Sequence, residues 1–376
     1  MSIKVLIADD SSFQRKLIKN MIDTHKDIEV IAIARNGRDA IEKIGKHNPD
    51  VLVLDLIMPE MDGFDAFEFL SEHYPIPTII FSALDPRNLD YAVQALLLGA
   101  VDYIQKPEGD WKTELSKVRD QLIDKIKIAS NINKSYKMRH ETFLDALVEQ
   151  KNIMGKVIKI DTSKTEKSAV KQKDKVETIP LIKPKSSIIV IGASVGGPRT
   201  IKSILSTIPK DFQPPILIVQ HMNDHFMKQF CNSLNNFCKI EVKIPKNGEI
   251  IESNTIYLAP GGKHMEIIMK SNKPCIKTFK GEPVNFCIPS VDVLFLSAAN
   301  VYSKNAMGIL LTGMGRDGVD GLRAIKDKGG RAITESKETC ILYGMPKIAA
   351  ETGAAELIIP NYKVKECMVK FSRREV

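Results

Sequence analysis

The sequence lacks the features of membrane-spanning, secreted and zinc-stabilised proteins. No apolar run approaches the roughly 18 residues that a bilayer-crossing helix needs. The first residues, MSIKVLIADD, have a strand pattern and show neither the basic region nor the small-residue cleavage site of a signal peptide. The six cysteines contain no C-x-x-C pair, which argues against a zinc site or a disulfide framework. These absences predict a cytoplasmic protein with reduced thiols and no direct membrane insertion.

The net charge also gives little reason to expect nucleic acid as a partner. The chain carries a formal charge of +8, but residues 151–175 alone hold eight lysines against three acidic residues. A polar segment of this kind is typical of a solvated linker. We therefore expect no nucleic-acid partner.

Two stretches of the chain alternate apolar runs with helical patterns. Continuous apolar strands that are separated by helices are typical of parallel sheets covered on both faces. We predict an α/β protein with two doubly wound parallel-sheet domains, a flavodoxin-like domain followed by a Rossmann-like domain. The predicted strands of the first domain are 4–8, 28–34, 51–57, 77–83 and 101–106. Those of the second are 186–194 and the segments PPILIVQHM, NTIYLAP, AMGILLTGM and RAITE.

The predicted domains are 1–123 and 186–372, joined by a helical extension and basic linker over 124–185. A helix over 111–138 closes the first domain. From about residue 140 to about residue 185 the chain is rich in Lys, Ser and Thr, with weak periodicity after about residue 152, which favours a linker over this segment.

Three aspartates of the first domain lie where predicted strands end. Asp9 and Asp10 follow the first strand, and Asp55 ends a central apolar run. In open parallel sheets these strand ends meet at one edge, where ligands bind. Clustered carboxylates repel one another unless a cation joins them, and Mg²⁺ prefers oxygen ligands. Ser82 and Lys106 also end strands, and their hydroxyl and ammonium groups could bind a phosphoryl group on Asp55.

These residues, with the segment MPEMDG after Asp55, resemble the receiver domain of two-component response regulators over residues 1 to about 123. The resemblance implies a histidine kinase as phosphoryl donor and Mg²⁺ as the cofactor of phosphorylation. Asp9 belongs to the same acidic pocket. The implied roles are Asp55 as phosphoacceptor, Asp10, Asp55 and the Ile57 carbonyl as Mg²⁺ ligands, Ser82 as switch hydroxyl and Lys106 as phosphate partner.

The second domain begins with a glycine-rich turn between a strand and a helix. Its letters GASVG fit the pattern G-x-S-x-G, which presents a serine, here Ser194, on a sharp turn at the top of a sheet. Such a turn is also common in phosphate or dinucleotide cradles. The pattern G-x-G-x-x-G and the lysine of a P-loop are both absent, which argues against a cradle.

A serine nucleophile needs a base and a group that orients this base. His221 ends the strand ILIVQH and is the favoured base over His225 and His264. Asp317 follows the strand in GILLTGMGRDG and is the favoured acid, with two rivals. The amide of Met314, in the same glycine-rich loop, could donate to an oxyanion. The two rival acids are Asp292 and Asp320.

The segments GASVGG, QHM, LAPGG, PSVDVLFLSAA, LTGMGRDG and YGMP resemble the catalytic domain of the chemotaxis protein-glutamate methylesterases over about 186–370. The resemblance implies hydrolysis of glutamate methyl esters on methyl-accepting chemoreceptors, with methanol as a product. It also implies Ser194 as nucleophile, His221 as base, Asp317 as its orienting partner and the Met314 amide as an oxyanion donor. The ester reaction is expected to need no cofactor.

Three residues depart from the family pattern. Val195 stands where the family usually has Thr, Asn223 where Pro is frequent, and Cys340 where Ser is common. The loss of a hydroxyl at position 195 leaves the fine positioning of the nucleophile open.

Having a switch and an enzyme in one chain suggests that the unphosphorylated receiver covers Ser194 and that phosphorylation of Asp55 releases it.

Deamidation of receptor glutamines would use the same triad. A phosphorylation-dependent adaptor with an inert esterase domain is an alternative. A DNA-binding response regulator would need a helix-turn-helix after the linker, where residues 186–370 instead alternate strands and helices.

Overall fold

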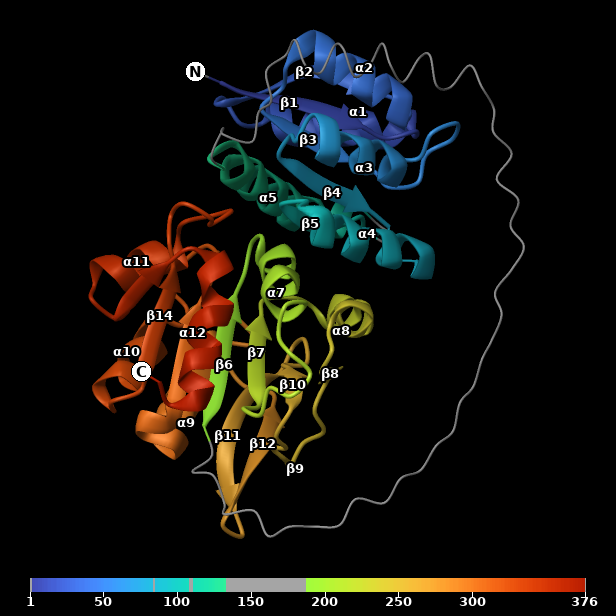
Figure 1. The fold of residues 1–376 in the computed structure, drawn as a ribbon. Helices are drawn as coiled ribbons and strands as arrows, with labels where there is room; N and C mark the ends of the chain where they lie inside the picture. The colour runs from blue at the N-terminus through green and yellow to red at the C-terminus, as the bar shows by residue number, and fades with distance from the viewer. Residues whose placement is uncertain (1, 84, 108–110, 133–186, 376) are drawn as a thin grey trace.

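A computed structural model of the chain describes residues 2–83, 85–107, 111–132 and 187–375. Within these residues the chain folds into two α/β units, which Figure 1 shows in blue to teal and in green to red. No helix of this described part is both long enough and apolar enough to cross a membrane.

The predicted domain boundaries stay predictions. The helix α5 (Trp111–Ser130) runs across the predicted boundary at residue 123. The predicted linker segment 140–185 and the last residues of the helix predicted over 111–138 lie outside the described residues.

The first sheet is fully parallel, with the strand order β2-β1-β3-β4-β5. This order is that of flavodoxin-like folds and confirms the predicted fold of the first unit. The chain leaves β1 toward β2 on one side and toward β3 on the other, so the switch point lies between β1 and β3. The strands are β1 (Ile3–Ala8), β2 (Ile28–Ala34), β3 (Val51–Leu54), β4 (Thr78–Ser82) and β5 (Asp102–Gln105).

Helices cover both faces of this sheet. On one face α1 packs against α5, and on the other α3 packs against both α2 and α4. Three of these helices have an N-cap residue whose side chain accepts a hydrogen bond from an amide of the first turn. These N-cap residues are Ser11, Asn36 and Asp62. The helices besides α5 are α1 (Ser12–Asp23), α2 (Gly37–His47), α3 (Gly63–His73) and α4 (Pro86–Leu98).

The second sheet is a parallel sheet of seven strands in the order β15-β14-β13-β6-β7-β10-β8. Its switch point lies between the neighbours β6 and β13, because the chain moves from β6 toward β7 and from β13 toward β14. The predicted doubly wound architecture is confirmed. The strands are β6 (Ile188–Ala193), β7 (Ile216–Gln220), β8 (Glu241–Lys243), β10 (Thr255–Leu258), β13 (Ala306–Leu310), β14 (Arg331–Glu335) and β15 (Leu357–Ile359).

A small antiparallel sheet, absent from the sequence prediction, extends from the second unit. It pairs β11 (His264–Lys270) with β12 (Lys273–Phe279), and β12 with β9 (Glu249–Ile250). Ser271 and Asn272 connect β11 to β12, and both have positive φ, as the tight turns of β-hairpins require. Figure 1 shows this sheet at the end of the unit that lies away from the first unit.

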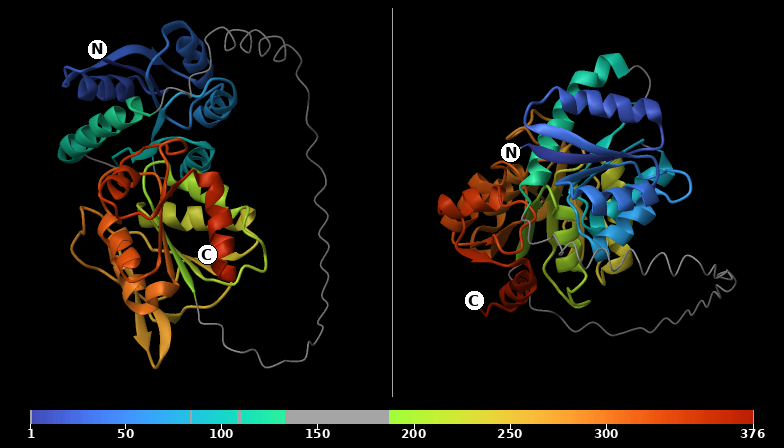
Figure 2. Two further views of the ribbon diagram at one scale, coloured as in Figure 1. Left: turned by 60° about the vertical axis from the view of Figure 1, so that its left-hand side comes forward. Right: turned by 90° about the horizontal axis from the view of Figure 1, so that it is seen from above.

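Helices cover both faces of the second sheet (Figure 2). The helices α7, α8 and α12 contribute Ile204, Phe230 and Met368 to one buried cluster, while α9, α10 and α11 contribute Leu294 and Leu322, among others, to a second. A single 3-10 turn, Ser303–Asn305, follows α9. The helices are α7 (Gly197–Leu205), α8 (Asp224–Phe237), α9 (Val291–Tyr302), α10 (Val319–Asp327), α11 (Met345–Glu351) and α12 (Asn361–Arg373).

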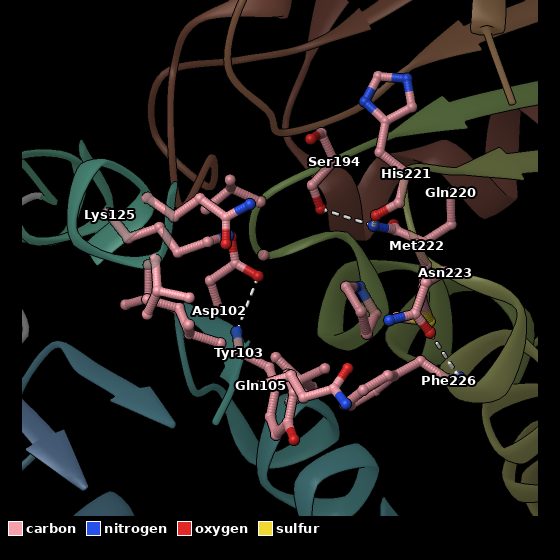
Figure 3. A pocket seen from close by; sticks show the side chains of 18 of the residues that line it. Asp102, Tyr103, Gln105, Lys125, Ser194, Gln220, His221, Met222, Asn223 and Phe226 are labelled. Carbon is pink, nitrogen blue, oxygen red and sulfur yellow. Dashed lines mark hydrogen bonds and ion pairs between the residues drawn. The ribbon is translucent and has the colours of Figure 1, made fainter. Parts of the chain in front are cut away.

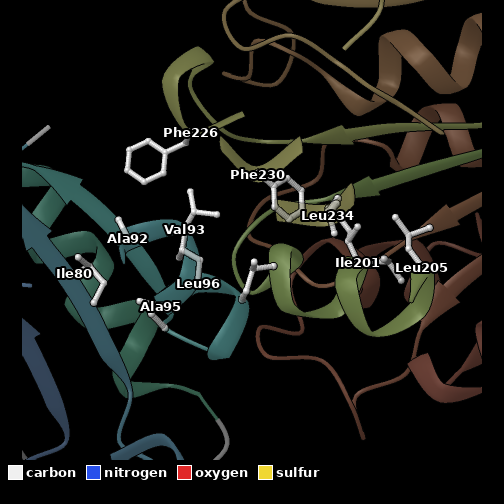
Figure 4. Packing of buried hydrophobic residues seen from close by; sticks show 14 of the residues in the cluster. Ile80, Ala92, Val93, Ala95, Leu96, Ile201, Leu205, Phe226, Phe230 and Leu234 are labelled. Atoms are coloured by element: carbon white, nitrogen blue, oxygen red, sulfur yellow. The ribbon is translucent and has the colours of Figure 1, made fainter. Parts of the chain in front are cut away.

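The two units pack together through α4 of the first and α7 and α8 of the second. One buried apolar cluster runs across this contact, so that Leu96 and Val93 share it with Phe230 and Ile201 (Figure 4). Because burial of large apolar side chains is favourable by roughly 1.5–3 kcal/mol each, this contact holds the two units in a defined arrangement.

Candidate functional sites

The predicted phosphorylation site lies at the switch point of the first sheet. Asp9 follows β1 and Asp55 follows β3. The Nζ of Lys106 lies 2.7 Å from Oδ2 of Asp9 and 2.5 Å from Oδ2 of Asp55, and the Ser82 hydroxyl donates to Oδ1 of Asp55 at 2.6 Å. The structure therefore brings together four residues that the sequence placed at separate strand ends.

Burial and the pairing of Lys106 with two carboxylates together set the pKa values at this site. Burial raises the pKa of Asp9, and Lys106 offsets only part of this shift because Asp55 repels the Asp9 charge. Burial lowers the pKa of Lys106, but Asp55 and Asp9 outweigh it and raise that pKa. Carboxylate oxygens of Asp9, Asp10 and Asp55 lie within 4.8 Å of one another. The Lys106 ammonium pairs with two of these three carboxylates, which leaves negative charge that favours an additional cation.

Ser194 follows the central strand β6 at the switch point of the second sheet. Its amide donates to the Thr312 carbonyl at 2.9 Å, and its carbonyl accepts from the Gly197 amide at 2.8 Å, so the turn is fixed from both sides. Gly196 caps α7 with a φ of 76°, a conformation that favours glycine. The serine side chain thus stands at the N-terminus of α7, where backbone amides favour negative charge.

His221 and Asp317 form a hydrogen-bonded pair beside this turn. His221 follows β7, the neighbour of β6, and its amide donates to the Ala193 carbonyl at 3.1 Å. Its Nε2 lies 2.8 Å from Oδ2 of Asp317. Burial alone would lower the pKa of His221, but hydrogen bonds with Asp317 and Cys287 outweigh it and raise the pKa to about 9. Asp317 therefore occupies Nε2, and Nδ1 is the other ring nitrogen, with Sγ of Cys287 3.6 Å away.

Asp317 is almost fully buried, at 1% exposure, beneath the start of α9. Its oxygens accept hydrogen bonds from the amides of Val291 and Asp292 at 2.7 and 3.1 Å and from the Ser290 hydroxyl at 2.7 Å. Burial would raise the pKa of Asp317, but the bond with His221 and these further donors lower it. Asp317 is therefore a charged, fixed partner for the imidazole.

The alternative candidates for the base and for the orienting acid make contacts that do not involve Ser194. His225 is exposed in the first turn of α8. His264 is buried and joins the Glu282 carbonyl and the Ser290 amide, at 3.0 and 3.2 Å. Asp320 pairs with Arg316 at the surface. The fourth rival, Asp292, receives the Gly321 amide at 2.7 Å and supports the loop around Asp317.

The loop that carries Met314 lies directly against the serine. A Cβ added at Gly313 would stand 2.6 Å from the Cβ of Ser194, so only glycine permits this approach. Among the described residues, no hydrogen bond uses the Met314 amide. The Met314 side chain is 55% exposed. An amide at this place is available to an anion formed next to Ser194.

Two of the three departures from the family pattern have a local explanation in the structure. Asn223 is the N-cap of α8, and its Oδ1 accepts from the Phe226 amide at 3.1 Å. The carbonyl of Val195 accepts from the Thr312 hydroxyl at 2.9 Å, which fixes the turn without a hydroxyl at position 195. Nothing in the structure explains the preference for Cys340, which is buried.

Ser194 and His221 line a cavity of about 820 Å³ that lies between the two units. Figure 3 shows Ser194, His221 and Asn223 on one side of it, facing Asp102 and Lys125 of the first unit. The first unit therefore forms a wall of the cavity that holds the serine. Lys106 of the phosphorylation site is among the residues that line it.

Two further residues of this region carry no signal in the sequence pattern. The Sγ of Cys287 lies 3.6 Å from Nδ1 of His221, although 66 residues separate them. The Tyr103 hydroxyl donates to the Ser82 carbonyl at 2.7 Å, and its ring packs on Phe226 with 4.3 Å between centroids. Tyr103 thus connects the strand end beside Asp55 to the helix that follows His221.

Both halves of the chain match known families. The model of the CheB methylesterase family matches residues 189–368, and that of the response regulator receiver domain matches residues 5–116. The crystal structure of the catalytic domain of CheB methylesterase from Thermotoga maritima is 37% identical, with a TM-score of 0.48, and covers 49% of this chain and 98% of that one.

Relatives from archaea match along nearly the whole chain. The protein-glutamate methylesterase/protein-glutamine glutaminase of Pyrococcus horikoshii is 35% identical over 368 residues, which cover 98% of this chain and 93% of that protein. The protein of the same name from Archaeoglobus fulgidus is 37% identical over 371 residues, which cover 98% of each.

Proposed function

This chain belongs to the CheB methylesterase family, as its motifs predicted, and we propose that Ser194, His221 and Asp317 are the nucleophile, base and orienting acid of its reaction. The chain is a chemotaxis protein-glutamate methylesterase and protein-glutamine glutaminase with a receiver domain. The observation that carries the proposed triad is the 2.8 Å bond between His221 and Asp317 beside the turn of Ser194. Such a base held by a buried carboxylate is what a serine nucleophile requires.

The reaction proceeds through an acyl-enzyme. Nδ1 of His221 takes the proton of the Ser194 hydroxyl as Oγ attacks the ester carbonyl, and Asp317 stabilises the imidazolium. The C–O bond to the methoxy group breaks, and methanol leaves with the proton from His221. Water then attacks the acyl carbon and gives a proton to His221. The bond from the acyl carbon to Oγ of Ser194 breaks, His221 returns the proton to Oγ, and the glutamate carboxylate leaves.

Backbone amides stabilise the negative charge that forms on the carbonyl oxygen. Gly313, which directly precedes the Met314 amide, packs against Ser194, and α7 begins directly after the turn. Removal of one such donor typically costs about 3 kcal/mol of transition-state stabilisation. Met314 is proposed as one donor.

Glutamine deamidation follows from the same acyl-enzyme. The leaving group is then ammonia in place of methanol, and the second half of the reaction is unchanged. The names of the archaeal relatives, which give both activities, support this second substrate class.

In the receiver, Asp55 is the proposed phosphoacceptor, with Lys106 and Ser82 as partners of the phosphoryl oxygens. The acidic pocket fits a hard cation, because three carboxylates have oxygens within 4.8 Å of one another and the Lys106 ammonium pairs with only two of them. Mg²⁺ would neutralise charge on the phosphoryl group when bound. The residues proposed to hold it are Asp10, Asp55 and the Ile57 carbonyl, with Asp9 in the same pocket.

The proposed substrates are glutamate methyl esters and glutamines on the helices of methyl-accepting chemoreceptors. The proposed phosphoryl donor is the chemotaxis histidine kinase. Both assignments require the catalytic domain and the receiver to act in the cytoplasm. The position of the receiver against the cavity of Ser194 supports control by occlusion, in which phosphorylation of Asp55 weakens the contact of α4 with α7 and α8.

The test measures methanol release from a methylated receptor and ammonia release from a receptor with an encoded glutamine. Wild type is compared with Ser194→Ala and with Ser203→Ala, a matched control on the exposed face of α7. We expect Ser194→Ala to lose both activities and Ser203→Ala to keep both. Full adaptation with the Ser194→Ala protein would instead support the adaptor with an inert esterase domain.

A further inference from the structure

A cysteine stands beside the proposed catalytic base. The Sγ of Cys287 lies 3.6 Å from Nδ1 of His221, while Oδ2 of Asp317 holds Nε2 at 2.8 Å. Ligand atoms of the three side chains all lie within 4.8 Å of one another. Imidazole, thiolate and carboxylate are the side-chain groups that bind zinc in proteins.

The loop that carries this thiol has a defined shape. Val284 and Cys287 exchange two backbone hydrogen bonds, at 3.2 and 3.0 Å, around Asn285 and Phe286. The Asn285 side chain donates to Oδ2 of Asp292 at 2.7 Å, which ties the loop to the start of α9. The sulfur is therefore held next to the imidazole by two backbone hydrogen bonds and by the half-buried Asn285 side chain.

The separation of the two atoms fits a shared metal ion. Zinc binds sulfur at about 2.3 Å and nitrogen at about 2.0–2.1 Å, so tetrahedral geometry puts the two ligand atoms roughly 3.5 Å apart. The observed distance from Sγ to Nδ1 is 3.6 Å. A carboxylate on the other ring nitrogen is the usual partner of a metal-bound histidine, and Asp317 occupies this place.

We propose that Nδ1 of His221 and Sγ of Cys287 bind a thiophilic divalent transition metal such as Zn²⁺, with Asp317 as the orienting carboxylate, and that its binding switches off the esterase. The inhibition rests on the proposed function, since Nδ1 is the atom that takes the Ser194 proton. A metal on this nitrogen removes the base.

The site at His221 and Cys287 and the acidic pocket around Asp55 then bind different kinds of cation. Thiolate and imidazole favour zinc and related metals, whereas the oxygens around Asp55 favour Mg²⁺. His221 lines the cavity of about 820 Å³, through which an ion can reach it.

The binding test titrates the full, tag-free chain with Zn²⁺ in a calorimeter, with excess Mg²⁺ present to fill the oxygen site. The variants are Cys287→Ser and Cys287→Ala, with Cys367→Ser as a control at a half-buried cysteine on α12. We expect a site that both Cys287 variants weaken more than tenfold and that the control keeps. Equal zinc affinity of the wild type and both variants would overturn the proposal.

A spectroscopic test identifies the ligand. Co²⁺ bound at this site should give a sulfur-to-cobalt charge-transfer absorption in the wild type and in Cys367→Ser. The same absorption in the Cys287 variants would overturn the assignment of the sulfur.

The activity test compares methanol release with and without Zn²⁺ for each protein, relative to its own rate with a chelator. Zn²⁺ should inhibit the wild type reversibly, and Cys287→Ser should need more than tenfold more metal. Full activity of the zinc-loaded wild type would overturn the inhibitory role. A failure of the proposed function is distinguishable, because it would abolish methanol release without metal and leave the binding result unchanged.

Discussion

The phosphorylation site and the esterase site are built on the same architecture and differ in what surrounds the carboxylate. Each lies at the switch point of a parallel sheet. Asp55 meets a hydroxyl, an ammonium and two other carboxylates, so its charge is only partly balanced. Asp317 receives two amides, a hydroxyl and an imidazole, so its charge is fully hydrogen-bonded. The shared fold positions each carboxylate at a strand end. The residues of the surrounding loops determine whether that carboxylate is a phosphoacceptor or an orienting acid.

One residue of the phosphorylation site also reaches the cavity of the esterase site. Lys106 lines the cavity that contains Ser194, and Tyr103 joins the Ser82 carbonyl to the ring of Phe226. A change in charge at Asp55 therefore acts on residues that reach the wall of the esterase site. The following changes test whether the two carboxylates have the separate roles that this comparison assigns.

The largest expected effect is that of Asp317→Asn. The amide keeps the size of the side chain but cannot hold the imidazole in the tautomer that accepts the Ser194 proton. We expect the rate of methanol release to fall by about 10⁴-fold, as the corresponding change does in a serine protease. The surface change Asp320→Asn is the control and should leave the rate unchanged. Equal rates for both variants would remove Asp317 from the triad.

The pH dependence comes next. Since the pKa of His221 is raised to about 9, the neutral imidazole increases about tenfold per pH unit below that value. The kcat/KM for methanol release, measured with a chelator, should rise until about pH 9 after subtraction of the Ser194→Ala rate. The raised pKa of His221 also stabilises the folded state. This stabilisation is fully present below the unfolded-state pKa of about 6.5 and is lost as the pH rises through about 9. A plateau already at pH 7 would contradict the raised pKa.

A smaller effect is expected at the contact between the units. Nε2 of Gln229 donates to Oδ1 of Asp90 at 2.5 Å across this contact. Loss of such a bond typically costs about 1 kcal/mol, so Gln229→Ala should raise the unphosphorylated esterase rate about fivefold. Lys228→Ala on the same helix is the control, because Lys228 pairs with Asp224 within α8. An unchanged rate in Gln229→Ala would show that this contact does not restrain the enzyme.

The sequence was sufficient to predict the five strands of the first sheet and five of the seven parallel strands of the second, but not its short edge strands β8 and β15. Long apolar runs, and a side chain such as Asp55 or Ser194 directly after one, are local features that a single chain displays. The hairpin of β11 and β12 was missed because its strands carry polar and charged residues on a partly exposed face. The neighbourhood of Cys287 and His221 depends on how a loop before α9 folds over β7, which no local pattern encodes.

The measurement that tests the central claim most directly is methanol release by the full chain with and without a small-molecule phosphodonor. We predict a clear increase with the donor in the wild type, and none in Asp55→Asn, whose basal rate matches that of the wild type. A fragment of residues 180–376 should be as fast as the phosphorylated wild type. Equal rates of the full chain with and without the donor, both matching the fragment, would contradict control of Ser194 by Asp55.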